Sequence, residues 1–342
     1  MEHNQFWEHS PKHRINYQVP YDLDLNDVAF PNEVSTPETD RMLDMLFKED
    51  AAYMWAWLGY SFVRSNANWQ LLTFLYGVPG NGKNTFQRNF LNKLFGMENI
   101  GALDEEQLTT KSQYNLINLQ GKFVNIASDM TGEFNKEWTI LKRVSGGDIV
   151  EVEAKQVQAT QMVNTASLLF VTNVYPQMAL DEGMNRRIQI VEMRTPSLKT
   201  DELKKQYSIN WQKVWDEIPH VAFKAIRYYM AHKDNPLPPI SEHMKQQKEQ
   251  FKKDANPVSR FVTEHLTPDE PDRGVSIKYL YEQYIAEMKF NGMKYISQPK
   301  FQKEIKNLGY QLEIAHPHGN DYNGQRLTRV LNWQYETPSS VM

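Results

Sequence analysis

The sequence contains no cysteine among its 342 residues, which excludes disulfide bonds and thiolate-ligated metal centres. It also lacks a long hydrophobic run. The longest apolar stretch, residues 51–63 (AAYMWAWLGYSFV), is much shorter than the roughly 20 residues that a membrane-spanning helix needs. The first residues, MEHNQFWEHSPKHR, lack the apolar core of a signal peptide. We therefore expect a cytoplasmic protein that has no membrane partner.

An excess of basic side chains is missing as well, since the formal net charge is −4. The charge is unevenly distributed: residues 1–50 hold 11 acidic and 4 basic side chains, a net of −7, which leaves +3 for the rest of the chain. The net charge therefore excludes a uniformly basic nucleic-acid binder, but it does not exclude a local nucleic-acid site.

Short apolar runs alternate with segments of helical spacing, which predicts an α/β fold with a mostly parallel sheet covered by helices. The predicted strands are residues 70–77, 122–129, 166–173 and 186–193, and the predicted helical segments are residues 35–65, 83–95, 105–118, 135–144 and 201–232.

Composition divides the chain into four predicted parts. Residues 1–66 are an irregular acidic arm with an N-terminal helical segment, residues 67–233 are the α/β domain, residues 234–254 are a linker, and residues 255–342 are a second domain. In the second domain we predict helices at 257–265, 277–289 and 298–308 and strands around 275, 310–315 and 325–333. This is the element order of a winged helix.

Residues 77–85, GVPGNGKNT, follow the first predicted strand and lead into a helix. A glycine loop in this position turns backbone N–H groups and a helix N-terminus toward a phosphate, and Lys83 is placed to reach the β- and γ-phosphates. The hydroxyl that normally follows the lysine and binds Mg²⁺ is replaced by Asn84, with Thr85 one residue later. Either oxygen is an acceptable Mg²⁺ ligand. The alternative is a glycine-rich hairpin with a surface lysine. The predicted ATP-binding residues are Gly77, Pro79, Gly80, Asn81, Gly82, Lys83, Asn84 and Thr85.

Three further polar positions follow the predicted strands. Asp129 ends the second strand, where an acid of a P-loop NTPase holds Mg²⁺, and Asn173 ends the third, where an amide can orient the attacking water. Arg186 and Arg187 head the fourth, and a guanidinium there can stabilise a phosphoryl group in transfer. Each has a plain alternative: a turn-capping acid, a turn asparagine before Pro176, and a solvated arginine pair.

The order of these segments resembles the superfamily 3 helicases, and within them the C-terminal half of phage and plasmid primase-helicases, which are related to the poxvirus primase-helicase. Five motifs carry the resemblance: Gly77–Thr85, Gly121–Asp129, the LK-x-x-x-GGD run Leu141–Asp148, Leu168–Asn173 and Arg186–Val191. The resemblance covers roughly residues 30–200.

The resemblance implies an AAA+-like ATPase that binds ATP and Mg²⁺, assembles into a homo-oligomeric ring, usually a hexamer, and translocates on DNA in a bacterial host cell. It makes Lys83 and Asp129 the Walker residues, Asn173 the sensor, and Arg186 or Arg187 a finger that reaches a neighbour's ATP. Asp129 replaces the glutamate of many members, which favours a metal role over a base role. Residues 1–76 precede the loop, too few for a primase domain, so priming is expected from a separate primase or polymerase.

Two places are predicted to contact DNA. The resemblance implies a hairpin at residues 148–162, with Lys155 and Gln156 near its turn, and the alternative is that Lys155 is an ordinary exposed strand residue. In the second domain, SQPKFQKEIKNLGY carries Lys300, Lys303 and Lys306 on one helical face, opposite Phe301, Ile305 and Leu308. Winged helices also serve as protein contacts, which is the alternative there.

The most direct prediction is an ATP-dependent replicative DNA helicase of a phage or mobile genetic element. One alternative is an ATP-dependent DNA-binding initiator or loader that does not itself unwind processively. Another is a small-molecule P-loop kinase, which leaves the series of motifs after the loop unexplained.

Overall fold

The computed structural model describes residues 18–22, 34–63, 69–109, 113–128, 139–154, 157–175, 182–271, 273–290, 295–315 and 327–336. These residues form two compact units. The first holds the described residues up to Lys245 apart from 174–185, and the second holds the rest. None of the helices in the described ranges combines the length and the apolar character that crossing a bilayer requires.

The first unit is built on a five-stranded sheet in the order β2-β3-β6-β1-β7, and every neighbouring pair in it is parallel. The strands are β1 (Leu72–Tyr76), β2 (Ile100–Gly101), β3 (Val124–Ser128), β6 (Ser167–Thr172) and β7 (Ile188–Glu192). The predicted α/β class with a parallel central sheet is thus confirmed. The four predicted strands are present, and the short edge strand β2 was not predicted.

The central strands are apolar because both of their faces are covered. All six residues of β6 are buried, and in β1 only Tyr76 is partly exposed. Phe74 of β1 stacks on Phe170 of β6 with ring centroids 4.9 Å apart. A run of this kind, without alternation of polar residues, is typical of a parallel sheet between layers of helices.

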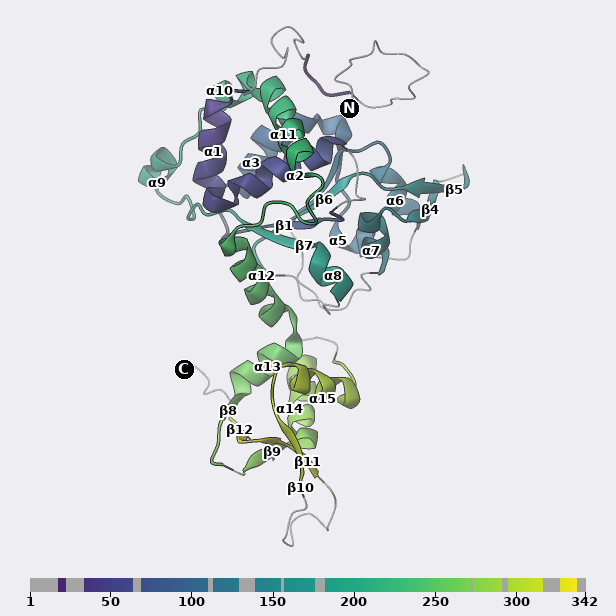
Figure 1. Ribbon diagram of the computed structural model, residues 1–342, viewed down its shortest axis with the longest axis vertical. Coiled ribbons are helices and arrows are strands. Elements are labelled where there is room, and N and C mark those ends of the chain that lie inside the picture. Colours follow the sequence, from purple (N-terminus) through teal and green to yellow (C-terminus); the bar gives the residue numbers. More distant parts are fainter. Residues whose placement is uncertain are drawn as a thin grey trace. The chain divides into compact units, whose positions relative to one another are not determined.

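Helices of the first unit surround this sheet (Figure 1). They are α1 (Pro37–Phe47), α2 (Ala51–Val63), α3 (Lys83–Phe86), α4 (Asn92–Phe95), α5 (Glu105–Thr109), α6 (Gln113–Leu116), α7 (Thr139–Gly146), α9 (Asp201–Gln206), α10 (Trp211–Asp216) and α11 (Ile218–His232). A π-helical stretch, Gln87–Leu91, joins α3 to α4. The border between the two units falls within α8 (Glu182–Arg187).

Two predictions of element bounds were wrong in detail. The segment 201–232 is three helices, because Asn210 accepts a hydrogen bond from the Lys213 backbone and starts α10 afresh, and Pro219 stands in the first turn of α11. The strand predicted to begin at residue 186 begins at Ile188, since the two residues before it form the last turn of α8.

Helix α2 packs against α11 at Gly59. A Cβ atom at this position would lie only 1.9 Å from the backbone oxygen of Ala225, so the two helices can approach this closely only at a glycine. Beside this contact, the ring of Tyr60 stacks on Trp69 and meets Tyr229 edge to face. The segment predicted as a helix before the glycine loop therefore covers the sheet together with α11 rather than standing apart.

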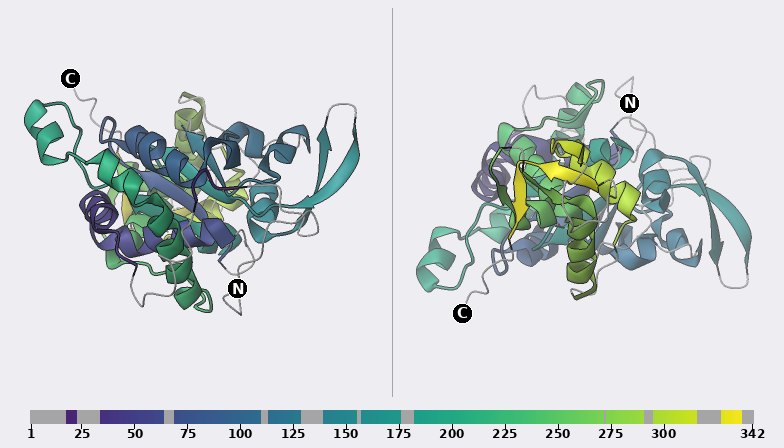
Figure 2. Two further views of the ribbon diagram at one scale, coloured as in Figure 1. Left: turned by 90° about the horizontal axis from the view of Figure 1, so that it is seen from above. Right: turned by 90° about the horizontal axis from the view of Figure 1, so that it is seen from below.

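The predicted hairpin at residues 148–162 is present as β4 (Ile149–Ala154) and β5 (Val157–Val163). The strands are antiparallel, with Ile149 opposite Val163, and they project from the body of the first unit (Figure 2). The turn residues Lys155 and Gln156 lie outside the described residues.

Helix α12 (Glu242–Ala255) begins in the first unit and continues into the second from Gln246, where the sequence predicted a linker.

The second unit then continues with a separate set of helices and strands. Its elements are α13 (Pro257–His265), β8 (Leu266–Pro268), β9 (Gly274–Ser276), α14 (Ile277–Phe290), α15 (Gln298–Asn307), β10 (Leu312–Ala315), β11 (Leu327–Leu331) and β12 (Trp333–Tyr335). The strands pair in the orders β10-β11-β9 and β12-β8. The predicted helices and strands are present, whereas β8 and β12 were not predicted.

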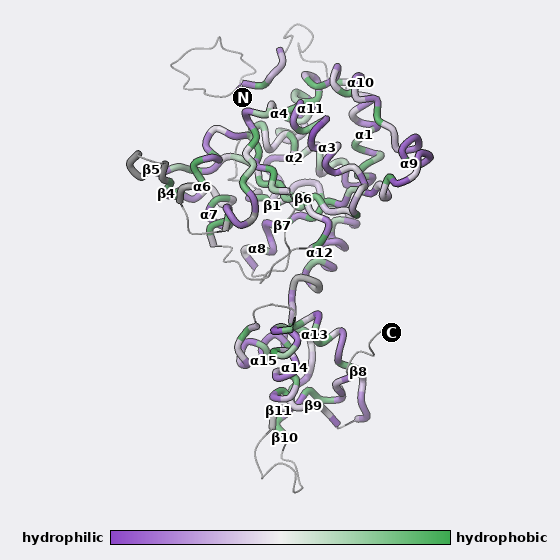
Figure 3. Tube along the Cα trace, turned by 180° about the vertical axis from the view of Figure 1, so that it is seen from behind, coloured by the Kyte–Doolittle hydropathy of each residue, from purple (hydrophilic) through white to green (hydrophobic). Residues whose placement is uncertain are grey.

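The core of the second unit is aromatic. Phe261 of α13, Tyr284 of α14 and Phe301 of α15 are fully buried and contact one another, with ring centroids 4.9–6.2 Å apart. The helices of this unit carry both hydrophobic and hydrophilic positions, as the colours of the chain trace show (Figure 3).

Candidate functional site

The glycine loop between β1 and α3 owes its shape to two glycines. Gly80 and Gly82 have φ angles of 76° and 100°, a region that side-chain-bearing residues rarely adopt. Gly82 directly precedes Lys83, the first residue of α3. The predicted strand–loop–helix arrangement is therefore present, and the backbone N–H groups of the first helical turn are aimed out of the loop.

Lys83 is buried, and its ammonium group is satisfied by the loop itself. Nζ donates to the backbone oxygens of Gly77 and Val78 at 2.6 and 3.0 Å and to Oδ1 of Asn81 at 3.1 Å. Burial lowers the pKa of Lys83 to about 8, because desolvation disfavours the charged form. The ammonium group of Lys83 is thus held by three neutral oxygen atoms of the loop. A negatively charged acceptor such as a phosphate would bind it more strongly.

A segment distant in the sequence clamps the loop. This clamp segment, residues 193–198, continues from the end of β7. The Met193 oxygen accepts a 3.0 Å hydrogen bond from Nδ2 of Asn81, Thr195 Oγ1 donates to the Asn81 oxygen at 2.7 Å, and the Leu198 N–H donates to the Gly80 oxygen at 3.0 Å. Asn81, which is 1% exposed, therefore joins the loop to the clamp segment and holds Lys83 at the same time.

The loop opens into a pocket of about 370 Å³. It is lined by Pro79, Gly80, Asn81, Gly82, Lys83, Asn84, Thr85, Val171, Thr172, Asn173, Leu198 and Lys204. The structure thus brings Asn173, at the end of β6, to the predicted loop, because the carboxyl ends of neighbouring parallel strands meet at one edge of the sheet.

Sequence reasoning missed Leu198 and Lys204 in this pocket. Leu198 ends the clamp segment and lies over Gly82, where a Cβ would be 3.9 Å from Leu198 Cδ1. Lys204 lies on α9, and its Nζ is 2.9 Å from Oδ1 of Asp201. No local pattern marks either residue, since both reach the pocket only through the pairing of β7 with β1 more than 100 residues earlier in the chain.

Asp129 lies outside the described residues, but the strand that leads to it is described. β3 ends at Ser128, whose Oγ donates to Oε1 of Gln87 at 3.4 Å, in the helical segment that follows the loop. β6 lies between β3 and β1, so the carboxyl end of β3 is one strand removed from the loop. The assignment of Asn84, Thr85 and Asp129 to a metal ion stays a prediction.

Arg186 and Arg187 lie at the amino ends of the strands, whereas the pocket lies at their carboxyl ends. Ile188, directly after them, pairs with Leu72 at the start of β1, whereas the loop follows Tyr76 at its end. A strand of this length rises by about 13 Å, so both arginine backbones are far from the loop of their own chain. Arg186 is exposed and its Nη2 donates to Oε1 of Gln70 at 2.6 Å, whereas Arg187 is only 8% exposed.

The three predicted lysines of the second unit are exposed on α15. Lys300, Lys303 and Lys306 face solvent, and Phe301 and Ile305 are buried, as the helical spacing predicted. Leu308 was assigned to the apolar face but follows the end of α15 and is 37% exposed. A DNA-binding role of these lysines stays a prediction.

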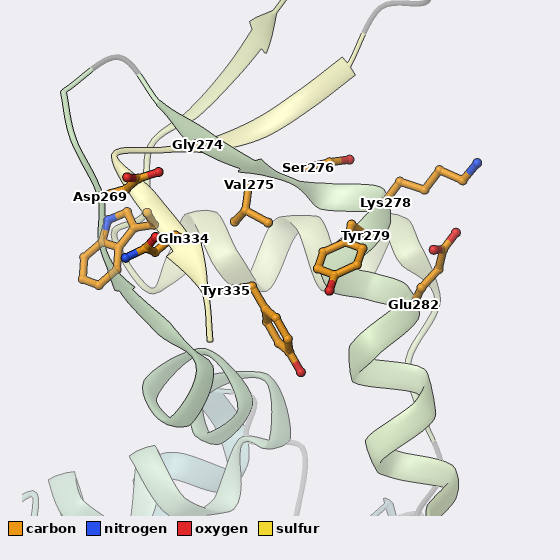
Figure 4. A pocket seen from close by; sticks show the side chains of 10 residues that line it. Asp269, Gly274, Val275, Ser276, Lys278, Tyr279, Glu282, Gln334 and Tyr335 are labelled. Carbon is orange, nitrogen blue, oxygen red and sulfur yellow. The ribbon is translucent and has the colours of Figure 1, made fainter. Parts of the chain in front are cut away.

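A second pocket, of about 640 Å³, lies in the second unit between β9, the start of α14 and β12 (Figure 4). Its lining combines the rings of Tyr279, Trp333 and Tyr335 with the carboxyl groups of Asp269 and Glu282. It does not include the lysines of α15, so this pocket and the predicted DNA-binding face are separate features.

Among the described residues, one group of His and acidic side chains is close enough to hold a metal ion: Glu264, His265 and Glu287. His265 Nε2 lies 2.6 Å from Glu287 Oε2, and the guanidinium of Arg260 lies 3.4 Å from the other oxygen of Glu287 and 3.7 Å from Glu264. Arg260 supplies a cation to both carboxylates and His265 is in hydrogen-bond contact with Glu287, so we interpret the group as a structural polar cluster of the second unit.

Comparisons with known proteins match two separate parts of the chain. Residues 75–187 match a family of unknown function, DUF5906, and residues 253–312 match the family described as poxvirus D5 protein-like. No curated protein matches the chain. The predicted relation to a poxvirus protein is therefore supported in part, for the terminal region.

Similar solved structures include two of the NrS-1 C-terminal region without ligand. The first, an A form, is 14% identical with a TM-score of 0.46, and the second, residues 305–718, is 10% identical with a TM-score of 0.43. Each comparison covers 95% of this chain and 79% of the other.

Substituting Asn81 by alanine should loosen the loop. The substitution leaves the Met193 oxygen and the Lys83 ammonium each without one partner, which costs about 1–3 kcal/mol of unfolding free energy for buried groups. Urea unfolding measures the loss. The exposed neighbour Asn84 is the matched control, and Asn84→Ala should stay within about 0.5 kcal/mol of the wild type. Equal stabilities of the two variants would contradict the clamp.

Proposed function

We propose that this protein is an ATP-dependent replicative DNA helicase of a phage or mobile genetic element, with an AAA+-like P-loop NTPase domain of superfamily 3 that works as a six-subunit ring. The observation that carries the proposal is the pocket in which the glycine loop, the buried Lys83 and Asn173 converge at one edge of a parallel sheet. The family match over residues 253–312 supports a replication protein of the D5 type.

The loop has the chemistry that a nucleoside triphosphate requires. The first turn of α3 offers backbone N–H groups and a positive helix end, and Lys83 adds an ammonium group that only carbonyl oxygens now hold. Lys204 is a second cation on the pocket wall and is suited to the same phosphates. Bound ATP with Mg²⁺ would supply the phosphoryl group, with Asn84, Thr85 and Asp129 as candidate metal ligands.

Strand order supports the roles of acid and amide. Because β6 lies between β1 and β3, Asn173 at its end stands between the loop and the strand that leads to Asp129. An amide there can hold the attacking water beside the last phosphate, and an acid beyond it can hold the metal. Each residue thus has one role: Lys83 binds phosphate, Asn173 orients water and Asp129 binds Mg²⁺.

The position of Arg186 supports catalysis between subunits. This exposed arginine lies at the end of the strands away from the pocket of its own chain, which suits contact with a nucleotide bound by a neighbouring subunit. Arg187 is buried and is better suited to holding structure than to reaching another subunit. Of the two predicted candidates we therefore favour Arg186 as the finger.

DNA contact is assigned to two elements. The hairpin β4–β5 projects from the first unit, which suits a channel-lining element with Lys155 and Gln156 at its turn. The order α13, β9, α14, α15, β10, β11 and the exposed lysines of α15 suit a winged helix that contacts phosphates. A separate primase or polymerase would act with the helicase in the cytoplasm of the bacterial host.

Replacing Lys83 by alanine should abolish ATP hydrolysis without unfolding the protein. The test measures DNA-stimulated phosphate release and strand displacement on a forked duplex. Lys205→Ala is the matched control, since Lys205 is an exposed lysine of α9 that does not line the pocket. Hydrolysis by Lys83→Ala at the wild-type rate would refute the site, whereas wild-type hydrolysis without strand displacement would favour an initiator or loader.

Mixing two inactive variants should partly restore hydrolysis. In a mixed ring of Lys83→Ala and Arg186→Ala subunits, some interfaces combine an intact lysine with an intact arginine, because the two residues of one site come from different chains. Phosphate release is measured across mixing ratios. Restoration with Arg187→Ala but not with Arg186→Ala would move the finger to Arg187, and failure of both mixtures would exclude catalysis between subunits.

Nucleotide binding should take up a proton at high pH. The pKa of Lys83 is lowered to about 8 in the free protein and rises again beside a polyphosphate, so the lysine is already charged at pH 7 and must gain a proton at pH 9. Titration calorimetry with ADP in buffers of different ionisation enthalpy should give an uptake near zero at pH 7 that approaches one proton at pH 9. In Lys83→Arg, which stays charged at both pH values, this difference should vanish. The same uptake in wild type and variant would contradict the role of Lys83.

A further inference from the structure

Gln70, two residues before the start of β1, adopts an unusual backbone conformation. Its φ angle is 53°, in the left-handed region where a side-chain-bearing residue is uncommon. Its side chain makes two hydrogen bonds to distant segments. Oε1 accepts from Nη2 of Arg186 at 2.6 Å, and Nε2 donates to the backbone oxygen of Gly146 at 3.2 Å. Residues held in such a conformation concentrate at functional positions, because the surrounding structure must enforce them.

Gly146 belongs to the base of the projecting hairpin. Helix α7 ends at Gly146, Gly147 follows with a φ of 78°, and β4 begins at Ile149. We call residues 145–149 the hairpin root. Arg143 of α7 contacts the last residue of this root, since its Nη2 donates to the Ile149 oxygen at 2.6 Å.

The arginine pair faces this root from the other side. Nη2 of Arg187 lies 3.3 Å from the point that a Cβ of Gly146 would occupy, so the guanidinium is close to this glycine. Arg186 reaches the same root through Gln70. The two arginines that precede β7 are therefore connected to the start of β4 within one chain.

We propose that Gln70 is a positioning residue that links Arg186 to the hairpin root, so that DNA held by the hairpin changes how Arg186 meets the neighbouring subunit's nucleotide. This inference rests on the proposed function. An amide suits the link because its oxygen accepts from a guanidinium while its nitrogen donates to a carbonyl, and a carboxylate has only acceptors. Gln70 therefore carries the DNA stimulation of hydrolysis and does not itself contact nucleotide or DNA.

Gln70→Gly separates this role from a merely structural one. Glycine adopts a φ of 53° without strain, so the variant should unfold at or above the wild-type temperature although the link is lost. We expect the ratio of DNA-stimulated to basal ATPase to fall from the wild-type value to below twofold, with the KM for ATP within about twofold of wild type. Lys48→Gly is the matched control, because Lys48 has the same φ of 53° and should keep the full ratio.

Gln70→Glu tests the two halves of the link. The carboxylate keeps an acceptor for Arg186 but cannot donate to Gly146, so stimulation should fall as far as in Gln70→Gly. Wild-type stimulation in both variants would overturn the inference and leave the proposed function standing. Loss in Gln70→Gly alone would overturn the part played by Gly146.

Hydrogen exchange tests the link without any activity. Amides of the hairpin root should exchange several-fold faster in Gln70→Gly and in Arg186→Ala, and the double variant should exchange no faster than either single one. Unchanged protection of the root in Gln70→Gly would overturn the inference. If the wild type had no ATPase at all, the proposed function would fail, and this measurement would still decide whether the link exists.

Discussion

The site depends on one interaction, the clamp that Asn81 makes between the glycine loop and the chain beyond β7. Its side chain donates to the Met193 oxygen and accepts from Lys83, while its backbone oxygen accepts from Thr195. The clamp exists only because β7 pairs with β1 in a register that brings Glu192 opposite Tyr76. The conformation of a loop near residue 80 is thus set by residues near 195, and the cost of burying an amide and an ammonium is offset by pairing them with each other and with backbone oxygens.

The same parallel register separates Asn173 from Arg186, which are only 13 residues apart in the sequence. The pocket gathers at the carboxyl ends of the strands, while Arg186 and Arg187 lie where β7 begins. With the length of a strand between them, the loop and the backbones of the two arginines lie well apart within one chain. It also places the arginines beside the start of β1, where Gln70 lies, and within reach of the end of α7.

Local signals carried much of the prediction, and long-range contacts account for what it missed. The apolar runs around residues 72–76 and 167–172 and the glycine pattern at 77–85 are readable because their causes are local: burial on both faces and positive φ angles. Lys204 and Leu198 carry no such signal, because only strand pairing brings them to the loop. The apolar run that begins at Ile188 predicts a strand headed by the arginine pair, but both arginines belong to the short helix α8, and Arg187 is buried.

A chain with a net charge of −4 can still offer a strong anion site, because the relevant charge is local. Exposed lysines such as Lys204, which lies beside Asp201, are screened by water and by their own partners. Lys83 is different: it is 6% exposed, and the hydrogen-bond partners of its ammonium group within the described ranges are neutral carbonyl and amide oxygens. Burial weakens the charged form of this lysine in the free protein and, by the same low polarisability of its surroundings, strengthens its attraction to a bound anion. The net charge of the chain is therefore a poor guide to the charge of its ligands. The local environment of one buried ammonium group is a better guide.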